Sequence, residues 1–199
     1  MSISAQVVKE LREKTGAGMM DCKKALVEAE GNFQKAIDIL RKKGQKVAAK
    51  RANRDASEGI AITKMNTDNT EGVAIVLACE TDFVAKTEGF KEIAHNISMQ
   101  IAATNPIAIR REDIDPELTD REKSIYHEQA KSSGKPEEII DKIVDGKLNK
   151  FFQDNCLLEQ TFIKDSEKNI QGLLNEIIVT LGENISVNRF TRFAIGEDT

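Results

Sequence analysis

The sequence has few of the residues that build metal sites, disulfide frameworks or membrane spans. Among 199 residues there are no Trp, one Tyr, two His and three Cys. The cysteines are odd in number and far apart, so neither a zinc motif nor an internal disulfide framework is expected. No run approaches 18 consecutive apolar residues, which predicts no membrane-spanning helix. The N-terminus also does not resemble a secretory signal, so we expect a cytoplasmic protein without metal or cofactor.

Motifs of catalysis and of phosphate binding are missing as well. The sequence contains no GxxxxGK[ST] or GxGxxG, and Gly-Ala-Gly at 16–18 has no strand before it. Cys79 and His95 are a conceivable nucleophile and base, but Cys79 lies in an apolar segment where a cysteine usually fills space. Glu80 and Asp82 stand near a strand end and are expected to meet solvent. These residues make no positive case for an enzyme.

Charge is distributed unevenly along the chain. Residues 1–55 contain 13 Lys and Arg against 7 Asp and Glu, net +6, whereas the rest contains 16 against 26, net −10. This contrast predicts two domains, 1–55 and 56–199. The basic segment 41–54 has no aromatic residue for stacking on bases, which disfavours RNA binding. We interpret this segment as a helical or flexible linker, with a contact to an acidic partner or RNA as the alternative.

The first 55 residues predict a bundle of three short helices. Apolar residues recur at helical spacing over 3–14, and Ser4 is a plausible N-cap. We expect Asp21 to cap the second helix and Gly31 to end it. A third helix follows, which Gly44 is expected to interrupt. About 40 residues in three helices are close to the lower limit for independent folding.

The remainder predicts a small sheet with packed helices. The period changes to two near residue 57, giving a hairpin whose second strand is the more apolar and therefore central. Sparse apolar residues on the first arm of a helical hairpin, about 117–155, suggest that it protrudes. In the last strand, Ile185, Val187, Phe193 and Ile195 are expected on one face. The expected elements are strands at 59–65, 73–79 and about 185–195, and helices at 87–103, 117–132, 136–155 and 166–181.

This order of elements predicts an α+β fold. A small three-helix domain precedes a core with an antiparallel or mixed sheet, packed helices and the protruding antiparallel hairpin. Three strands leave exposed sheet edges, which favour pairing with a second copy of the chain.

Two short segments fit a protein-binding surface better than a core. Thr81-Asp82-Phe83-Val84 lies between an apolar strand and an amphipathic helix, and an aromatic residue beside an acid is unusual in a polar loop. Met19 and Met20 lie in the predicted loop between the first two helices, either at a binding surface or in the small core. A generic adaptor that binds through Met19 and Met20 is therefore one hypothesis, and a thiol enzyme with a low-pKa Cys79 is another.

Several longer stretches resemble one protein family. VKELREKTGAGMMDCKKAL (8–26) and CETDFVAKTEGF (79–90) are similar to the signature stretches of elongation factor Ts, the guanine-nucleotide exchange factor for elongation factor Tu. The similarity continues through SSGKPEEIIDKIVDGKLNKFF and ENISVNRFTRFAIGE, and it covers essentially the whole chain.

The resemblance implies a fold, a partner and a set of site residues. It implies a ubiquitin-associated-like N-terminal domain and a core with a helical hairpin. By position, Thr81, Asp82, Phe83 and Val84 match the motif that enters the nucleotide-binding domain of elongation factor Tu and disturbs its magnesium site. Three residues of the small domain are implied as further contacts: Met19, Met20 and Lys23. A partner that prefers the loosened state promotes GDP release without covalent chemistry, and the resemblance implies binding to elongation factor Tu in both its GDP-bound and its nucleotide-free form.

The sequence also departs from longer family members. It is shorter and retains roughly one core subdomain, as in short members that form homodimers. Gln100 stands where longer members have a histidine that acts on the phosphate side, so the resemblance implies Gln100 as a further partner contact whose role in the exchange differs from that of the histidine. Some short members link their subunits through a cysteine, but a cytoplasmic disulfide at Cys156 is disfavoured. We expect no contact with nucleic acid or membrane.

Overall fold

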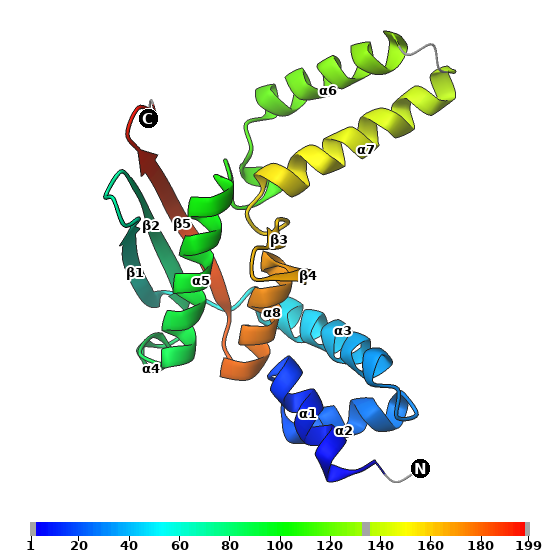
Figure 1. Ribbon diagram of the computed structural model, residues 1–199, viewed down its shortest axis with the longest axis vertical. Helices are drawn as coiled ribbons and strands as arrows, with labels where there is room; N and C mark the ends of the chain where they lie inside the picture. Colours follow the sequence, from blue (N-terminus) through cyan, green and yellow to red (C-terminus); the bar gives the residue numbers. More distant parts are fainter. Residues whose placement is uncertain (1–2, 133–135, 198–199) are drawn as a thin grey trace. The chain divides into compact units, whose positions relative to one another are not determined.

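The computed structural model describes residues 3–132 and 136–197, so most of the predicted turn at 133–136 lies outside it (Figure 1). The chain forms two compact units, Met1–Ser98 with Gln171–Thr199, and Met99–Ile170. The predicted division at residue 55 and the protrusion of the hairpin stay predictions. Helices combine with small antiparallel sheets, which confirms the α+β class.

Three helices at the start of the first unit pack around their own apolar core. They are α1 (Ala5–Thr15), α2 (Met19–Glu28) and α3 (Phe33–Arg51). Ser4 caps α1 as predicted, because its hydroxyl accepts from the Val7 amide at 3.3 Å. The buried residues come from all three helices and their connections: Val8, Leu11, Ala17, Cys22, Ala25, Leu26, Ala29, Ala36, Ile37 and Leu40.

Two predictions for this bundle are wrong. Asp21 does not cap α2, which begins two residues earlier after Gly18, and the Asp21 carboxylate instead pairs with Lys43 at 2.5 Å. Gly44 does not interrupt α3, which continues to Arg51. Gly44 is buried, and a Cβ there would lie 3.7 Å from Val179, so it packs against α8 (Ile170–Leu181) without breaking the helix. The basic segment is therefore mainly helical.

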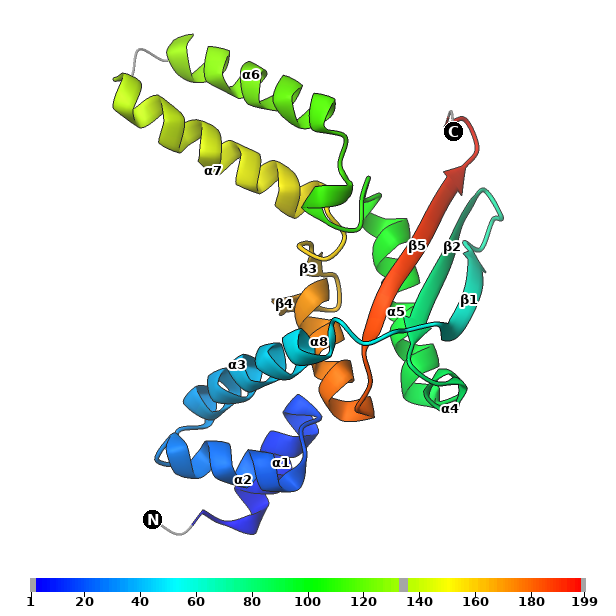
Figure 2. The ribbon, with the colours of Figure 1, turned by 180° about the vertical axis from the view of Figure 1, so that it is seen from behind.

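The main sheet has the strand order β1-β2-β5 and is antiparallel throughout. Its strands are β1 (Glu58–Met65), β2 (Glu71–Cys79) and β5 (Ile185–Ala194). The prediction that the second strand is central is confirmed. Figure 2 shows the segment between α3 and β1 from behind.

A bulge changes the alternation of side chains along β5. Val76 pairs with Arg189 but Leu77 pairs with Val187, so Asn188 is the extra residue. Val187 is buried, whereas Phe193 is 40% exposed. The prediction that these two residues share a face is therefore wrong, because the extra residue reverses the alternation after Asn188.

Two helices supply apolar stripes to the first unit. They are α5 (Glu88–Thr104), which belongs to this unit up to Ser98, and α8, which belongs to it from Gln171. α5 lies in front of the strands in Figure 1, and its predicted stripe is buried at Phe90, Ile93, Ala94 and Ile97. Helix α8 begins four residues later than predicted. Residues 165–169 instead form β4 (Asp165–Asn169), which pairs with β3 (Thr161–Phe162) in the second unit.

The second unit contains the predicted helical hairpin. Its arms are α6 (Pro116–Ser132) and α7 (Glu137–Asn155). Pro136 is the N-cap of α7, whereas it was predicted as the first residue of this helix. Ala130, Ile140 and Val144 form a small buried cluster between the arms. The 3-10 turn η1 (Arg111–Asp113) precedes α6. Its first residue, Arg111, pairs through the guanidinium with Glu159 and lies 4.6 Å from the centre of the Phe152 ring.

Candidate partner-binding site

The segment predicted as a loop is a single helical turn, α4 (Asp82–Ala85). β2 ends at Cys79, and Thr81 is in an extended conformation directly before the turn. The Thr81 hydroxyl accepts from the Val84 amide at 3.4 Å and so acts as the N-cap. Asp82 in the first turn also suits the positive end of the peptide dipoles. Local capping therefore explains why these four residues are helical.

The turn presents an aromatic ring to solvent. The Phe83 side chain is 79% exposed, an unusual exposure for a large apolar residue. Val84 is half-buried, whereas Ala85 is 5% exposed. Ala85 therefore anchors the turn from below, with partial help from Val84, and Phe83 is left free for contact.

Asp82 lies beside this ring and carries a negative charge. Lys86 pairs with its carboxylate at 2.5 Å. The hydrogen bond from Lys86 is the main cause that lowers the pKa of Asp82 below its ordinary value, so the carboxylate is ionised at neutral pH. The face of α4 thus combines one exposed ring with one fixed negative charge.

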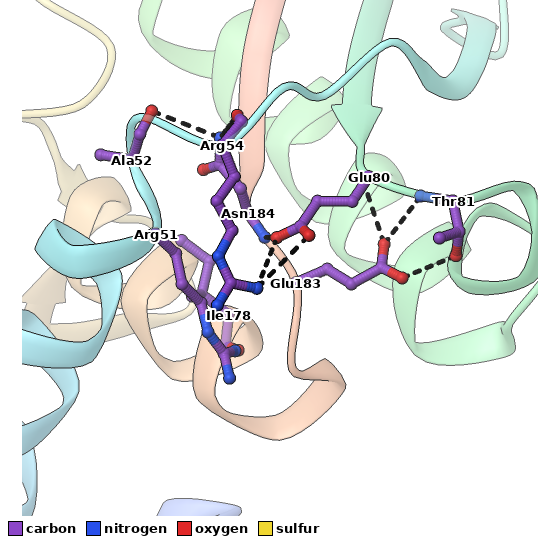
Figure 3. A network of polar contacts seen from close by, with 8 residues as sticks. All are labelled: Arg51, Ala52, Arg54, Glu80, Thr81, Ile178, Glu183 and Asn184. Carbon is purple, nitrogen blue, oxygen red and sulfur yellow. Dashed lines mark hydrogen bonds and ion pairs between the residues drawn. The ribbon is translucent and has the colours of Figure 1, made fainter.

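A pair of carboxylates connects this turn to the start of β5 (Figure 3). Glu183 accepts from the backbone amides of Glu80 and Thr81 at 3.1 and 3.0 Å, and from the Thr81 hydroxyl at 2.6 Å. In return, the Glu80 carboxylate accepts from the Asn184 amide at 2.6 Å. We call these reciprocal contacts the carboxylate clamp. Cys79 pairs with Ile185, so the sheet register brings the two segments together.

The clamp also reaches the segment that follows α3. Arg54 lies 3.4 Å from the Glu80 carboxylate, and the Asn184 side chain donates to the Arg54 carbonyl at 2.8 Å. Arg51 donates to the Ile178 carbonyl at 2.8 Å. Glu80, Glu183 and Asn184 were not predicted as site residues. Glu80 was noted for its strand-end position, and Glu183 and Asn184 lie in the family-like stretch ENISVNRFTRFAIGE. Neither signal indicated a link to the turn, because the contacts of Glu183 are with residues 102 and 103 positions away.

Met19, Met20 and Lys23 lie in the first turns of α2 and not in a loop. Met19 is 45% exposed and Met20 62% exposed, and Lys23 is also exposed. Of the two alternatives for the methionines, a surface position is therefore correct. Val27 is 58% exposed and follows Met20 by seven residues, so the same helix face continues to it. Val27 was not among the residues predicted for this surface.

Gln100 lies in the interior of the second unit. Its side chain is 0% exposed. The amide nitrogen donates to Gln160 and to the Thr161 carbonyl, both at 3.2 Å, and the amide oxygen accepts from the Ile163 amide at 2.9 Å. Thr104 donates to the same Gln160 oxygen at 2.7 Å. The polar atoms of Gln100 are therefore engaged within the chain.

The described residues offer little to the chemical alternatives. Cys79 donates to the Thr81 carbonyl at 3.1 Å. Burial, and then the Glu183 carboxylate, raise the pKa of Cys79, whereas a nucleophilic thiol needs a lowered pKa. Over residues 3–132 and 136–197 there is no cluster of three potential metal ligands from His, Cys, Asp and Glu. In the same ranges, no helix has the length and apolarity needed to cross a membrane.

Comparison with known proteins adds a family to this geometry. Residues 2–197 match the family model described as "Elongation factor TS". The chain is 53% identical to elongation factor Ts of Thermosipho melanesiensis, over 98% of this chain and 100% of that protein. It is 54% identical to elongation factor Ts of Fervidobacterium nodosum, over 99% and 100% of the two chains. It is also 54% identical to elongation factor Ts of Syntrophomonas wolfei, over 98% of this chain and 91% of that protein.

Proposed function

The chain belongs to the elongation factor Ts family, and on this premise we propose that it is a guanine-nucleotide exchange factor for elongation factor Tu. It is a translation elongation factor by family membership. In the proposed reaction it promotes GDP release and performs no covalent chemistry itself. We propose a cytoplasmic location, because translation elongation takes place there.

The observation that carries this proposal is the exposed ring of Phe83 on a fixed turn. Aromatic residues are frequent among the residues that dominate binding energy, especially where they fill a pocket in the partner. Phe83 is 79% exposed and is held on α4 beside the ionised Asp82. We propose that Phe83 inserts into the nucleotide-binding domain of elongation factor Tu while Asp82 disturbs the groups around its magnesium ion.

The proposed mechanism is a shift of population. Bound GDP owes part of its affinity to magnesium and to the phosphate loop, so a partner that binds the loosened state lowers that affinity. The coupling is reciprocal, and GDP must weaken the binding of this chain by the same factor. Thr81 and Val84 belong to the proposed contact as the cap and the inner side of the turn.

We propose a second contact at α2. Met19, Met20 and Lys23 are exposed there, and Met is an adaptable side chain at binding surfaces. Gln100 has a different place in the proposal. Because its amide is buried and engaged, we propose that it supports the end of α5 and does not touch the partner.

We also propose that two copies of the chain pair through the edges of the main sheet. β1 and β5 are the outer strands of this sheet, and outer strands expose unpaired backbone groups that can join another strand. Light scattering should give the mass of two chains for the free protein. A mass of one chain across micromolar concentrations would contradict the pairing.

The exchange function is tested by GDP release. Elongation factor Tu is loaded with fluorescent GDP and chased with unlabelled GDP, with this chain added at less than one equivalent. We expect the release rate to rise in proportion to the added chain, because each molecule acts repeatedly.

The variant Phe83→Ala tests the insertion of the ring. We expect it to lose acceleration by roughly 30-fold, as for an interface hot spot. Ile107→Ala is the matched control, because Ile107 is 51% exposed and lies outside α4 and α2. Equal acceleration by the two variants would contradict the role of Phe83.

A further inference from the structure

We propose that Glu183 is a positioning residue that holds the Phe83 turn in its binding-competent conformation. This inference deepens the proposed function and rests on it. Glu183 does not belong to the four-residue motif of the turn and lies about 100 residues later in the sequence. Its carboxylate nevertheless makes three hydrogen bonds to the two residues directly before α4.

The Thr81 hydroxyl has a single proton to donate. A hydroxyl has one donor and two acceptor lone pairs. Thr81 donates to Glu183 at 2.6 Å and accepts from the Val84 amide at 3.4 Å. Since the carboxylate only accepts, it fixes the direction of the proton and leaves a lone pair free for Val84. Glu183 therefore determines how well Thr81 caps α4.

Glu183 also holds the backbone that leads into the turn. One oxygen of Glu183 accepts from two successive amides, those of Glu80 and Thr81. Hydrogen bonds to a charged acceptor are stronger than those between neutral groups. Two such bonds from neighbouring amides fix the direction in which the chain leaves β2. That direction places Asp82 and Phe83.

Glu183 is itself held by its neighbours in the chain. Gly182 ends α8 with a φ of 83°, a conformation that favours glycine, and its amide donates to the Ile178 carbonyl at 3.0 Å. Asn184 is 8% exposed and is bound by the Glu80 carboxylate at 2.6 Å. Glu183 thus lies between two fixed neighbours, and its side chain is directed by a rigid segment.

The turn has few other supports of this kind. It contains only four residues, and its Asp82–Lys86 pair is solvent-exposed, where ion pairs contribute little. An isolated helical turn is unstable in water. The conformation of α4 therefore depends on the cap from Thr81, on the Thr87 hydroxyl, which donates to the Val84 carbonyl at 2.8 Å, and on the burial of Ala85, and Glu183 acts on the first of these.

The test uses a tryptophan introduced at position 83 as a local reporter. The chain has no Trp, so Phe83→Trp gives a single emission, called here the indole signal, that reports the order of the turn. We expect Glu183→Ala in this background to lower the anisotropy of the indole signal and to increase its quenching by acrylamide. The urea midpoint should fall by less than about 1 M, so that the chain remains folded in buffer. Glu183→Gln keeps one acceptor oxygen and should give an intermediate anisotropy.

Two other glutamates serve as matched controls. Glu128→Ala removes an exposed charge of α6, and the anisotropy should stay unchanged. Glu80→Ala removes the other half of the carboxylate clamp, whose carboxylate binds Asn184 and not the turn, so its effect should be smaller than that of Glu183→Ala. An indole signal that is the same in Glu183→Ala and Glu128→Ala would overturn the proposal. An effect of Glu80→Ala that equals or exceeds that of Glu183→Ala would also overturn it.

Exchange is then measured with Phe83 restored. We expect Glu183→Ala to slow the accelerated release of GDP by about tenfold, because small displacements of a positioned group are costly. If release slows while the indole signal stays unchanged, Glu183 acts by touching the partner, and the positioning role is wrong. If the wild-type chain does not accelerate release at all, the proposed function fails, whereas the indole measurement on the chain alone still decides the role of Glu183.

Discussion

Phe83 and Gln100 were both predicted to contact the partner, and the structure treats them in opposite ways. The aromatic ring of Phe83 is 79% exposed, whereas the polar amide of Gln100 is 0% exposed. The usual distribution places apolar groups inside and amides outside. The reversal at Phe83 is the observation on which the proposed contact with the partner rests. The reversal at Gln100 indicates a polar network kept for structure, with its hydrogen bonds made inside the chain.

Correspondence to a family motif therefore does not by itself determine the role of a residue. Phe83 reaches solvent because α4 is only four residues long and buries Ala85 instead. Gln100 is buried because residues 160–163 lie against the end of α5. A polar side chain such as that of Gln100 becomes part of the interior when the surrounding chain supplies the hydrogen bonds that solvent or a partner would otherwise supply.

The largest expected effect is on the stability of the Gln100 network. Gln100→Ala leaves the Ile163 amide and the Thr161 carbonyl without this partner, and it opens a cavity. We expect the free energy of unfolding to fall by about 3 kcal/mol. Urea denaturation followed by circular dichroism measures this change.

Gln153→Ala is the control for this substitution, because Gln153 is an exposed residue of α7. It should change stability by less than about 0.5 kcal/mol. The comparison between Phe83 and Gln100 breaks down if Gln100→Ala stays as stable as this control but loses exchange activity.

The next effect concerns Cys156, whose carbonyl accepts from the Gln160 amide in the same buried region. Burial raises the pKa of Cys156 to about 11 from 9.0. At pH 8 the thiolate fraction should fall roughly 100-fold, and labelling should slow accordingly. Peptide mass spectrometry after timed labelling measures the rate, with urea-unfolded chain as the control. Labelling of the folded chain at the unfolded rate would show that this region opens.

The raised pKa of Cys156 also predicts how the free energy of unfolding changes with pH. The folded chain holds the thiol proton more tightly than the unfolded chain does. The protonated thiol therefore stabilises the fold below pH 9, and this contribution is lost as the pH rises toward about 11. Urea midpoints should decrease over that interval.

A smaller effect is expected at Asp82. Asp82→Asn should slow the accelerated GDP release by about tenfold, because the negative charge beside Phe83 is lost. The lowered pKa of Asp82 keeps the wild-type carboxylate ionised, so the ratio between the two proteins should be constant between about pH 6 and 8.

Lys86→Gln separates the charge of Asp82 from its ion pair. It should raise the pKa of Asp82 back toward 3.8, which still leaves the carboxylate charged at neutral pH. Exchange by Lys86→Gln should therefore stay within about twofold of wild type, because exposed pairs contribute little. A tenfold loss in Lys86→Gln would assign the effect to the pair instead of to the charge.

At α2 we expect a smaller loss of exchange than at Phe83 or Asp82. Met20 is 62% exposed and belongs to the second proposed contact. Met20→Ala should slow GDP release roughly threefold, as for a residue outside the interface centre, and leave the unfolding free energy unchanged within about 0.5 kcal/mol. Loss greater than that of Phe83→Ala would move the main contact from α4 to the bundle and favour the adaptor hypothesis.

Much of the fold could be predicted because apolar periodicity reports burial directly. The stripe of α5, with Phe90, Ile93 and Ile97, is buried as its spacing predicts. The apolar run of β2 likewise indicated the central strand. Ser4 was recognisable as a cap from its local position.

Other features leave no local signal. α4 is too short to show a period, and residues 165–169 are polar, so they read as part of the following helix. The predicted site residues were the motif at 81–84, Met19, Met20 and Lys23 of α2, and Gln100. Glu183 remained hidden because its hydrogen bonds depend on the pairing of β2 with β5, which joins residues about 100 positions apart.

The bulge at Asn188 changes which alternate residues of β5 lie on each face of the sheet. Up to Val187 one set of alternate residues is buried, and beyond Asn188 the other set takes that place. Deleting Asn188 would remove only the bulge and keep both pairings, whereas deleting a residue beyond it, such as Thr191, would move Phe193 to the face of Val187. That shift would also take its ring from above Gly72, where a Cβ would lie only 2.4 Å from it. The number of residues in β5, and not only their kind, therefore carries structural information in this chain.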